Sequence, residues 1–267
     1  MKLPQRWCMA LAACSFLYII PPAASLPLTK EQLFQMATVA AASNQFDQSE
    51  ELFKKVLEID PKFAPAYNGL GLINQTMGPG NMDEAIRYFT LATSMAPEYA
   101  ESWNNLGRAC YSKGRFFDAK QAFMKSLQIN SDQPDVSFAL GWVYLLGESR
   151  PGEAIDCFDK ALAVKDNSLV YYGRGLAHMM LGDRFKVLDD ITELRKRKSE
   201  EQANLLEKMV RDNIRLISTP GTVLMTGLSG DEVSLFDEQL KALEAKGFNS
   251  RSTDGIKVRL KGSSPVY

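Results

Sequence analysis

Small and large apolar residues recur along the chain with a period of about 34 residues between positions 28 and 199. Small residues hold one recurring position: Ala37, Gly71, Gly107, Gly141 and Gly175. Large apolar residues hold a second: Phe53, Phe89, Phe123, Phe158 and Ile191. A third, always four residues before the second, holds Ser49, Ala85, Ala119, Ala154 and Val187. Three series in one register indicate five copies of one structural unit.

The spacing of apolar residues within a unit is that of helices. In the second unit, Ala85, Ile86, Phe89, Ala92 and Met95 recur every three to four residues, which places them on one helical face. Glycine, proline and asparagine residues separate these segments. Each unit is therefore predicted to be an antiparallel helix pair, in which the small residue lets the second helix approach closely. One pair cannot bury its own apolar face, so neighbouring pairs are predicted to stack into a superhelix.

Several segments resemble tetratricopeptide repeats. They are Ala66–Gly71 (AYNGLG), Ser102–Gly107 (SWNNLG), Asp83–Ile86 (DEAI) with Phe89, and Val56–Pro61 (VLEIDP). The resemblance implies an all-α fold, a right-handed α-solenoid of about five helix pairs with a C-terminal capping helix. Repeat one lacks the aromatic-Leu-Gly signature, and repeat five has Arg174 where leucine is usual.

The solenoid is predicted to end after the fifth pair. Its last helix runs into Arg195–Lys198, interpreted as a solvated helix end whose cations complement the helix dipole, with an anion or lipid-headgroup patch as the alternative. Ser199 and Gln202 form a capping-box pattern that opens a helix to about Ile217. No strand is evident in the pattern. The predicted divisions are a signal peptide (1–25), the solenoid with its capping helix (28–217), and a linker, an amphipathic helix (231–246) and a loosely ordered tail (218–267 together).

The first 25 residues have the order of a secretory signal. Lys2 and Arg6 precede an apolar run that is too short to span a membrane and is stopped by two prolines. Cleavage after Ser25 would start the mature chain at Leu26. A competing interpretation is that Leu-Ala-Ala-Cys, ending at Cys14, resembles the lipobox of bacterial lipoproteins, whose acylated cysteine tethers the protein to a membrane.

The amino-acid composition argues against nucleic-acid binding, multi-histidine metal sites and most forms of catalysis. The chain has 31 Lys and Arg against 32 Asp and Glu, a net charge of −1, which gives no global attraction for nucleic acid. Its one histidine, His178, excludes multi-histidine metal sites and leaves a single candidate base for nucleophilic triads. His178 falls at a packing position, and Cys110 and Cys157 fall inside helices of different repeats, so all three are interpreted as core residues. The sequence predicts no catalytic residue, no metal and no cofactor.

The resemblance implies a concave groove lined by the first helix of each pair. Its positions correspond to Asn68, Asn104, Asn105, Arg108, Phe138, Trp142 and Tyr172. Asparagine can bond a peptide backbone as donor and acceptor, Arg108 can hold a carboxylate, and Phe138 and Trp142 can serve as apolar anchors. An alternative is that Phe138 and Trp142 pack against the next repeat. Only fragments of the carboxylate clamp of chaperone-binding members occur here.

These observations together predict a non-enzymatic scaffold or adaptor, exported to the periplasm or cell envelope of a bacterium, that binds an extended peptide or partner protein in its groove. One alternative is a lipid-anchored assembly factor of a pilus or secretion machine, in which acylated Cys14 provides membrane contact. Another is an accessory or regulatory subunit of an envelope enzyme. The bacterial assignment rests on the style of the signal, and a eukaryotic secretory or organellar protein is its alternative.

Overall fold

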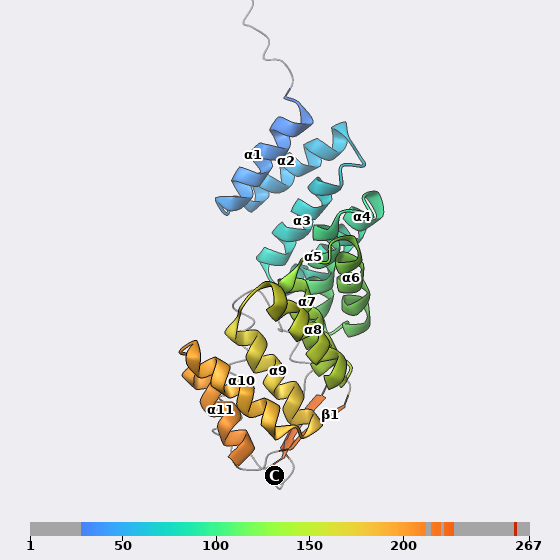
Figure 1. Ribbon diagram of the computed structural model, residues 1–267. Helices are drawn as coiled ribbons and strands as arrows, with labels where there is room; N and C mark the ends of the chain where they lie inside the picture. The colour runs from blue at the N-terminus through green and yellow to red at the C-terminus, as the bar shows by residue number, and fades with distance from the viewer. Residues whose placement is uncertain (1–27, 212–214, 220–221, 227–258, 261–267) are drawn as a thin grey trace, which may run out of the picture.

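The computed structural model describes residues 28–211, 215–219, 222–226 and 259–260. Antiparallel helices fill the first range and stack pair upon pair into an elongated array (Figure 1). The pairs are α1 (Lys30–Ala42) with α2 (Phe46–Ile59), α3 (Ala64–Met77) with α4 (Met82–Met95), α5 (Ala100–Ser112) with α6 (Phe116–Ile129), α7 (Pro134–Trp142) with α8 (Pro151–Val164), and α9 (Ser168–Leu181) with α10 (Arg184–Lys196). A 3₁₀ turn, η1 (Pro79–Asn81), precedes α4, a π turn, η2 (Val143–Gly147), follows α7, and α11 (Glu200–Arg211) follows α10. The predicted all-α solenoid of five helix pairs with a capping helix is confirmed.

Helix boundaries follow local sequence signals. The Thr29 hydroxyl accepts a hydrogen bond from the Gln32 N–H, and the Gln32 side chain accepts one from the Thr29 N–H, a capping box that opens α1. The side chains of Asn167 and Asp183 cap α9 and α10 in the same sense. Gly182 ends α9 in the left-handed region, at φ +77°, which glycine adopts without steric cost. Asn167, Gly182 and Asp183 thus stabilise the turns that lead into α9 and α10.

The recurring small and aromatic residues meet inside the helix pairs. A Cβ atom on Gly71 would lie 2.5 Å from the ring of Phe89, a separation that real Cβ atoms do not reach. The two helices can approach this closely because the first has no side chain at that point. In repeat five the corresponding Gly175 lies against Leu206 of α11, where a Cβ would be 2.7 Å from the leucine methyl. The capping helix thus takes part in the packing of the last repeat.

The C-terminal part differs from the prediction. The capping helix was predicted to reach about Ile217, but α11 ends at Arg211 and Arg215–Thr219 forms a strand, β1. β1 pairs antiparallel with β2 (Thr222–Thr226), which pairs in parallel with β3 (Arg259–Leu260). β1 contacts α9 and β2 contacts η2, so this small sheet lies against the last two repeats. The predicted signal peptide (1–25) and the predicted helix at 231–246 lie outside the described residues.

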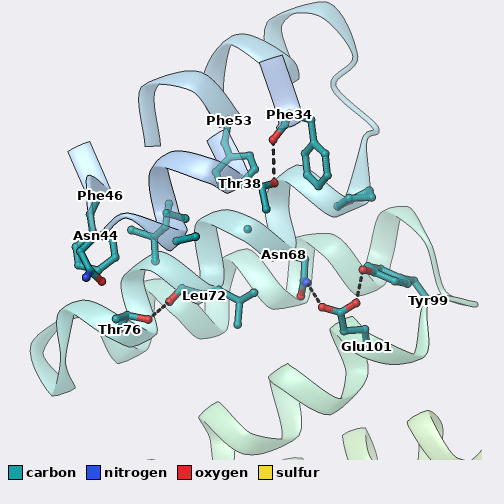
Figure 2. Close-up of a pocket in the computed structure, with 15 residues that line it drawn as sticks. Phe34, Thr38, Asn44, Phe46, Phe53, Asn68, Leu72, Thr76, Tyr99 and Glu101 are labelled. Atoms are coloured by element: carbon teal, nitrogen blue, oxygen red, sulfur yellow. Dashed lines mark hydrogen bonds between the residues drawn. The ribbon is translucent and has the colours of Figure 1, made fainter. Parts of the chain in front are cut away.

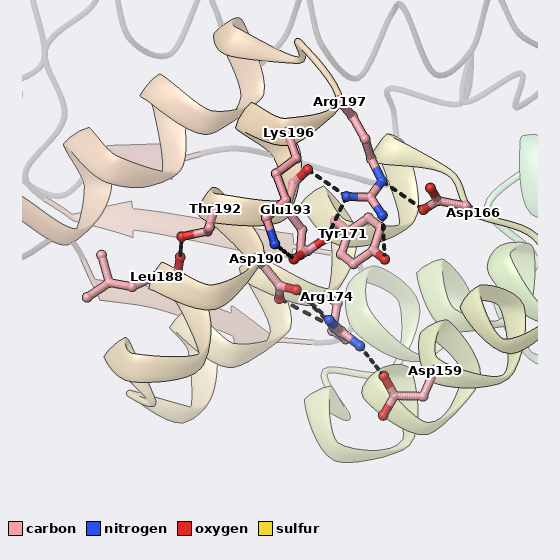
Figure 3. A network of polar contacts seen from close by, with 10 residues as sticks. All are labelled: Asp159, Asp166, Tyr171, Arg174, Leu188, Asp190, Thr192, Glu193, Lys196 and Arg197. Carbon is pink, nitrogen blue, oxygen red and sulfur yellow. Dashed lines mark hydrogen bonds and ion pairs between the residues drawn. The ribbon is translucent and has the colours of Figure 1, made fainter.

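A polar network joins the helices of repeats four and five (Figure 3). Arg174 on α9 forms ion pairs with Asp190 on α10, at 2.6 Å, and with Asp159 on α8. The Asp190 side chain is only 1% exposed, and burial raises its pKa to about 6 although Arg174 donates hydrogen bonds to it. Arg174, the departure from the repeat pattern noted in the sequence, therefore compensates a second departure, a buried aspartate on the facing helix.

The basic run at the end of repeat five is largely neutralised within the chain. Three of its four cations pair with carboxylates: Arg195 with Glu207, Lys196 with Glu193, and Arg197 with Asp166 and Glu193. This arrangement agrees with the interpretation of a helix end and leaves little unpaired charge for an anion patch. None of the helices in the described ranges combines the length and apolar character that a bilayer-spanning helix needs.

Candidate functional site

The inner faces of the first three repeats enclose a pocket of about 560 Å³, here called the N-terminal pocket (Figure 2). This volume falls in the range of roughly 300–1,000 Å³ that is typical of ligand sites. Its lining residues come from α1, α2, α3 and the start of α5: Phe34, Thr38, Ala41, Ala42, Asn44, Phe46, Phe53, Pro65, Asn68, Gly69, Leu72, Ile73, Thr76, Tyr99 and Glu101. The pocket forms because successive first helices stack side by side and leave a concave surface between them.

The walls of the N-terminal pocket are largely apolar. Phe34 and Phe53 pack with their ring centroids 5.6 Å apart on the side of repeat one. Leu72 is 39% exposed on α3. The hydroxyls of Thr38 and Thr76 donate to the carbonyls one turn back on their own helices, Phe34 O at 2.9 Å and Leu72 O at 2.8 Å. Because both hydroxyl protons are used in these hydrogen bonds, this part of the pocket presents mainly apolar surface to a bound peptide.

A chain of hydrogen bonds crosses one side of the pocket. The Asn105 amide donates to Asn68 Oδ1 at 3.0 Å, and the Asn68 amide donates to Glu101 Oε1 at 3.1 Å. The Tyr99 hydroxyl donates to Glu101 Oε2 at 2.6 Å. Asn68 and Asn105 are buried and Glu101 is exposed. The two asparagines therefore fix the orientation of an accessible carboxylate.

Four predicted groove residues lie in the first three repeats. Asn68 lines the N-terminal pocket and Asn105 supports it from α5. Asn104 and Arg108 are partly buried on α5 and do not line the pocket. Burial lowers the pKa of Arg108, and the nearby Asp135 of α7 opposes that shift. Two of the three predicted asparagines, Asn68 and Asn105, are thus brought together, whereas Arg108 lies near a carboxylate of its own chain.

The repeats of this chain are similar in sequence to a known repeat family and to several characterised proteins. Residues 33–63, 64–99 and 100–133 each match the tetratricopeptide repeat family. The chain contains tetratricopeptide repeats. Among curated relatives, it is 25% identical over 167 residues to the BBSome complex member BBS4 homolog of Drosophila melanogaster, covering 62% of this chain and 32% of that protein. It is 26% identical over 102 residues to the small glutamine-rich tetratricopeptide repeat-containing protein 2 of Mycosarcoma maydis, covering 38% and 28%. The chain thus spans about a third of the length of these relatives.

Solved structures show the same fold. The crystal structure of MamA matches with a TM-score of 0.57 at 22% identity, over 70% of this chain and 97% of MamA. YrrB, a tetratricopeptide-repeat protein with an unusual peptide-binding site, matches with a TM-score of 0.59 at 18% identity, over 66% of this chain and 91% of YrrB. At these identities the likeness establishes the solenoid fold alone.

The remaining predicted groove residues, in repeats four and five, are also buried. Phe138 on α7, Trp142 on α7 and Tyr172 on α9 are each less than 5% exposed. Trp142 packs edge-on against Phe158 of α8, with centroids 5.8 Å apart, and against Phe138 at 6.1 Å. These side chains fill the core between repeats four and five, so the prediction that they are open to a partner is wrong. The alternative interpretation of Phe138 and Trp142 was packing against the next repeat, and Trp142 does lie against Gly173 of α9, where a Cβ atom would be 3.2 Å from its ring.

Sequence analysis missed the carboxylate of the N-terminal pocket. Glu101 lies 33 residues after Asn68, which is about one repeat length. That spacing alone places two residues at neighbouring positions on adjacent first helices of tetratricopeptide repeats, so it could have paired them. Tyr99 was missed because it precedes α5 and belongs to the turn, where the repeat pattern specifies little.

The residues with intrinsic reactivity are core residues, as predicted. Burial raises the pKa of the Cys110 and Cys157 thiols to about 11, which keeps them protonated and unreactive at neutral pH. His178 is buried, its pKa is lowered by that burial and by the nearby cations, and its Nδ1 has no hydrogen-bond partner among the described residues. No cluster of three or more His, Cys, Asp or Glu side chains suited to a metal occurs in the described part of the chain. Tetratricopeptide repeats are generally non-enzymatic interaction modules, and the fold supports a protein–protein interaction scaffold.

Proposed function

We propose that this protein binds an extended segment of a partner protein in the N-terminal pocket. The observation that carries the proposal is the pocket itself: apolar walls from α1, α2 and α3 beside a fixed polar edge formed by Asn68, Asn105 and Glu101. Apolar pockets with a few oriented polar groups are the usual form of a binding site. The stacked first helices give the pocket the elongated surface that a peptide in extended conformation needs.

The comparisons support a binding role of this kind. YrrB shares the fold and has a peptide-binding site, described as unusual. The BBS4 homolog is a member of a multiprotein complex. Since the chain spans about a third of such relatives, their particular partners do not carry over to it.

Replacing Leu72 by asparagine is expected to weaken peptide binding about tenfold. The substitution keeps the size of the side chain and adds no charge, but it places an amide in the apolar wall, where a bound peptide would have to desolvate it. Nonapeptides selected on the wild-type protein from a random library with blocked termini provide the probes, and fluorescence polarisation measures their dissociation constants.

Met124→Asn provides the matched control. Met124 lies on α6, is 46% exposed against 39% for Leu72, and does not line the N-terminal pocket. Both variants carry the same small cost in helix propensity. Equal affinity of the two variants for the selected peptides, or a library from which nothing is selected, would contradict the assignment of the site.

We further propose that the protein is exported. Lys2 and Arg6 before a short apolar run, with small residues up to Ser25, support a cleaved signal. The protein is expressed in a bacterium that can both cleave secretory signals and acylate lipoproteins. Mass spectrometry of the product is expected to show a free N-terminus at Leu26. An acylated N-terminus at Cys14 would instead favour the lipid-anchored assembly factor, and an intact leader would contradict export by either route.

A further inference from the structure

Among the described residues that line the N-terminal pocket, Glu101 carries the single charged group. None of these lining residues is a lysine or an arginine. Two other carboxylates of the helix pairs are each neutralised by a cation of this chain: Asp60 pairs with Lys30 at 2.6 Å, and Asp190 pairs with Arg174 at 2.6 Å. Within the described ranges Glu101 has neutral hydrogen-bond donors and no ion-pair partner. The pocket therefore presents an uncompensated negative charge.

The carboxylate of Glu101 is also held in place. Each of its oxygens accepts one hydrogen bond, from the Asn68 amide at 3.1 Å and from the Tyr99 hydroxyl at 2.6 Å. Asn105 orients the Asn68 amide by donating to its oxygen, so that the Asn68 nitrogen is directed at Glu101. A carboxylate has about four lone-pair sites, and two of these are used. The other two remain for a donor that arrives with a ligand.

We infer that the N-terminal pocket selects an extended peptide segment that combines apolar side chains with a cationic group, and that this cation pairs with Glu101. The inference rests on the proposed function and specifies its partner. A lysine or arginine side chain and a free N-terminal amine share the required chemistry, since each offers charged N–H donors to a carboxylate. An acidic segment would meet a like charge with no cation beside it, so the preference is opposite to that of a carboxylate clamp.

The preference can be measured with matched peptides. The parent is the tightest nonapeptide selected with blocked termini, and each derivative differs at one point: a lysine, a norleucine or a glutamate at the same position, or norleucine with a free N-terminal amine. At least one of the two cationic arms is expected to bind about fivefold more tightly than the blocked norleucine peptide, because Glu101 is exposed and such pairs are modest. The glutamate peptide is expected to bind most weakly, and the preference should shrink as sodium chloride is raised.

Glu101→Gln tests the assignment to this residue. The amide keeps the size of the side chain and one acceptor oxygen but removes the charge, so cationic and neutral peptides should bind this variant equally. Glu98→Gln removes the same charge three residues away on an exposed side chain that does not line the pocket, and should keep the wild-type preference.

The outcomes separate this inference from the proposed function. Peptides that bind in a Leu72-dependent manner but show no preference for a cation, or a preference that survives Glu101→Gln, would overturn the inference and leave the pocket assignment intact. The absence of any peptide whose binding depends on Leu72 would overturn both.

Discussion

Replacing Arg174 by leucine, the residue usual at this position of the repeat, is expected to lower the free energy of unfolding by about 3–5 kcal/mol at neutral pH. The reason is that Asp190 loses the cation with which it pairs. Asp190 is 1% exposed, and Arg174 is the cation that donates to both of its oxygens. Removal of one member of a buried ion pair leaves an uncompensated charge in the core. Urea denaturation followed by circular dichroism measures the loss.

The size of this loss should depend on pH. Burial raises the pKa of Asp190 to about 6 in the folded protein, above its ordinary value of 3.8. An acid with a raised folded pKa destabilises the fold increasingly as pH rises from the unfolded pKa through the folded one. Without Arg174 the carboxyl pKa rises further, so the variant gains more stability on acidification than the wild type does. The difference between the two proteins is expected to be smaller at pH 5 than at pH 7.5.

The double variant Arg174→Leu, Asp190→Leu provides the control. It replaces the ion pair by two apolar side chains and should recover most of the loss, since hydrophobic replacements of buried ion pairs are often neutral. A single variant as stable as the wild type at pH 7.5 would show that Asp190 does not depend on Arg174.

Replacing Trp142 by alanine is expected to destabilise the protein by about 3–5 kcal/mol, the cost of a large cavity in a packed core. Trp142 is 2% exposed and packs against Phe138 and Phe158 where repeats four and five meet. The groove predicted from the sequence implied a different result, namely lost partner binding with unchanged stability. Thermal and urea unfolding distinguish the two.

Two further variants sharpen this test. Trp142→Phe keeps most of the packed ring and removes an indole N–H that has no acceptor among the described residues, so it should cost much less than alanine. Phe185→Ala removes an aromatic ring that is 84% exposed and should change stability by less than about 0.5 kcal/mol. Wild-type stability of Trp142→Ala together with loss of peptide binding would restore Trp142 as a groove residue.

The fold could be predicted because its determinants repeat. In repeats two to four the glycine and its aromatic partner, such as Gly71 and Phe89, make the same contact. A one-residue error in register would separate every such pair at once, so the period identifies the packing. The sequence shows that Arg174 departs from the repeat pattern, but it does not show why. Its partner Asp190 can be identified only from the packing of α9 against α10.

The candidate site was predicted in part. Asn68 and Asn105 were selected because inner positions of the first helices can bond a peptide, and they do lie at the N-terminal pocket. The same rule failed at Phe138, Trp142 and Tyr172. All five side chains are buried, but Asn68 and Asn105 lie at a pocket whereas Phe138 and Trp142 pack against Phe158, and the last two repeats carry additional contacts of β1 and β2. A periodic sequence does not encode that difference.

The C-terminal boundary was missed for a related reason. Apolar residues up to Ile217 continue the helical spacing of α11, so a helix pattern extends beyond the helix. The segment Leu216–Thr219 is also rich in residues that favour strands, and Pro220-Gly221 before another such run is a turn signal. Pairing with β2 resolves this ambiguity in favour of a strand.

The central claim is that the first three repeats form the binding surface. Hydrogen–deuterium exchange of the protein with and without a saturating amount of the tightest selected nonapeptide tests it most directly. We expect the peptide to slow exchange in α1, α3 and the first turns of α5, which line the N-terminal pocket, and to leave α7, α8 and α9 unchanged. Slowed exchange confined to α7 and α9 would contradict the account and place the site over Trp142 and Tyr172.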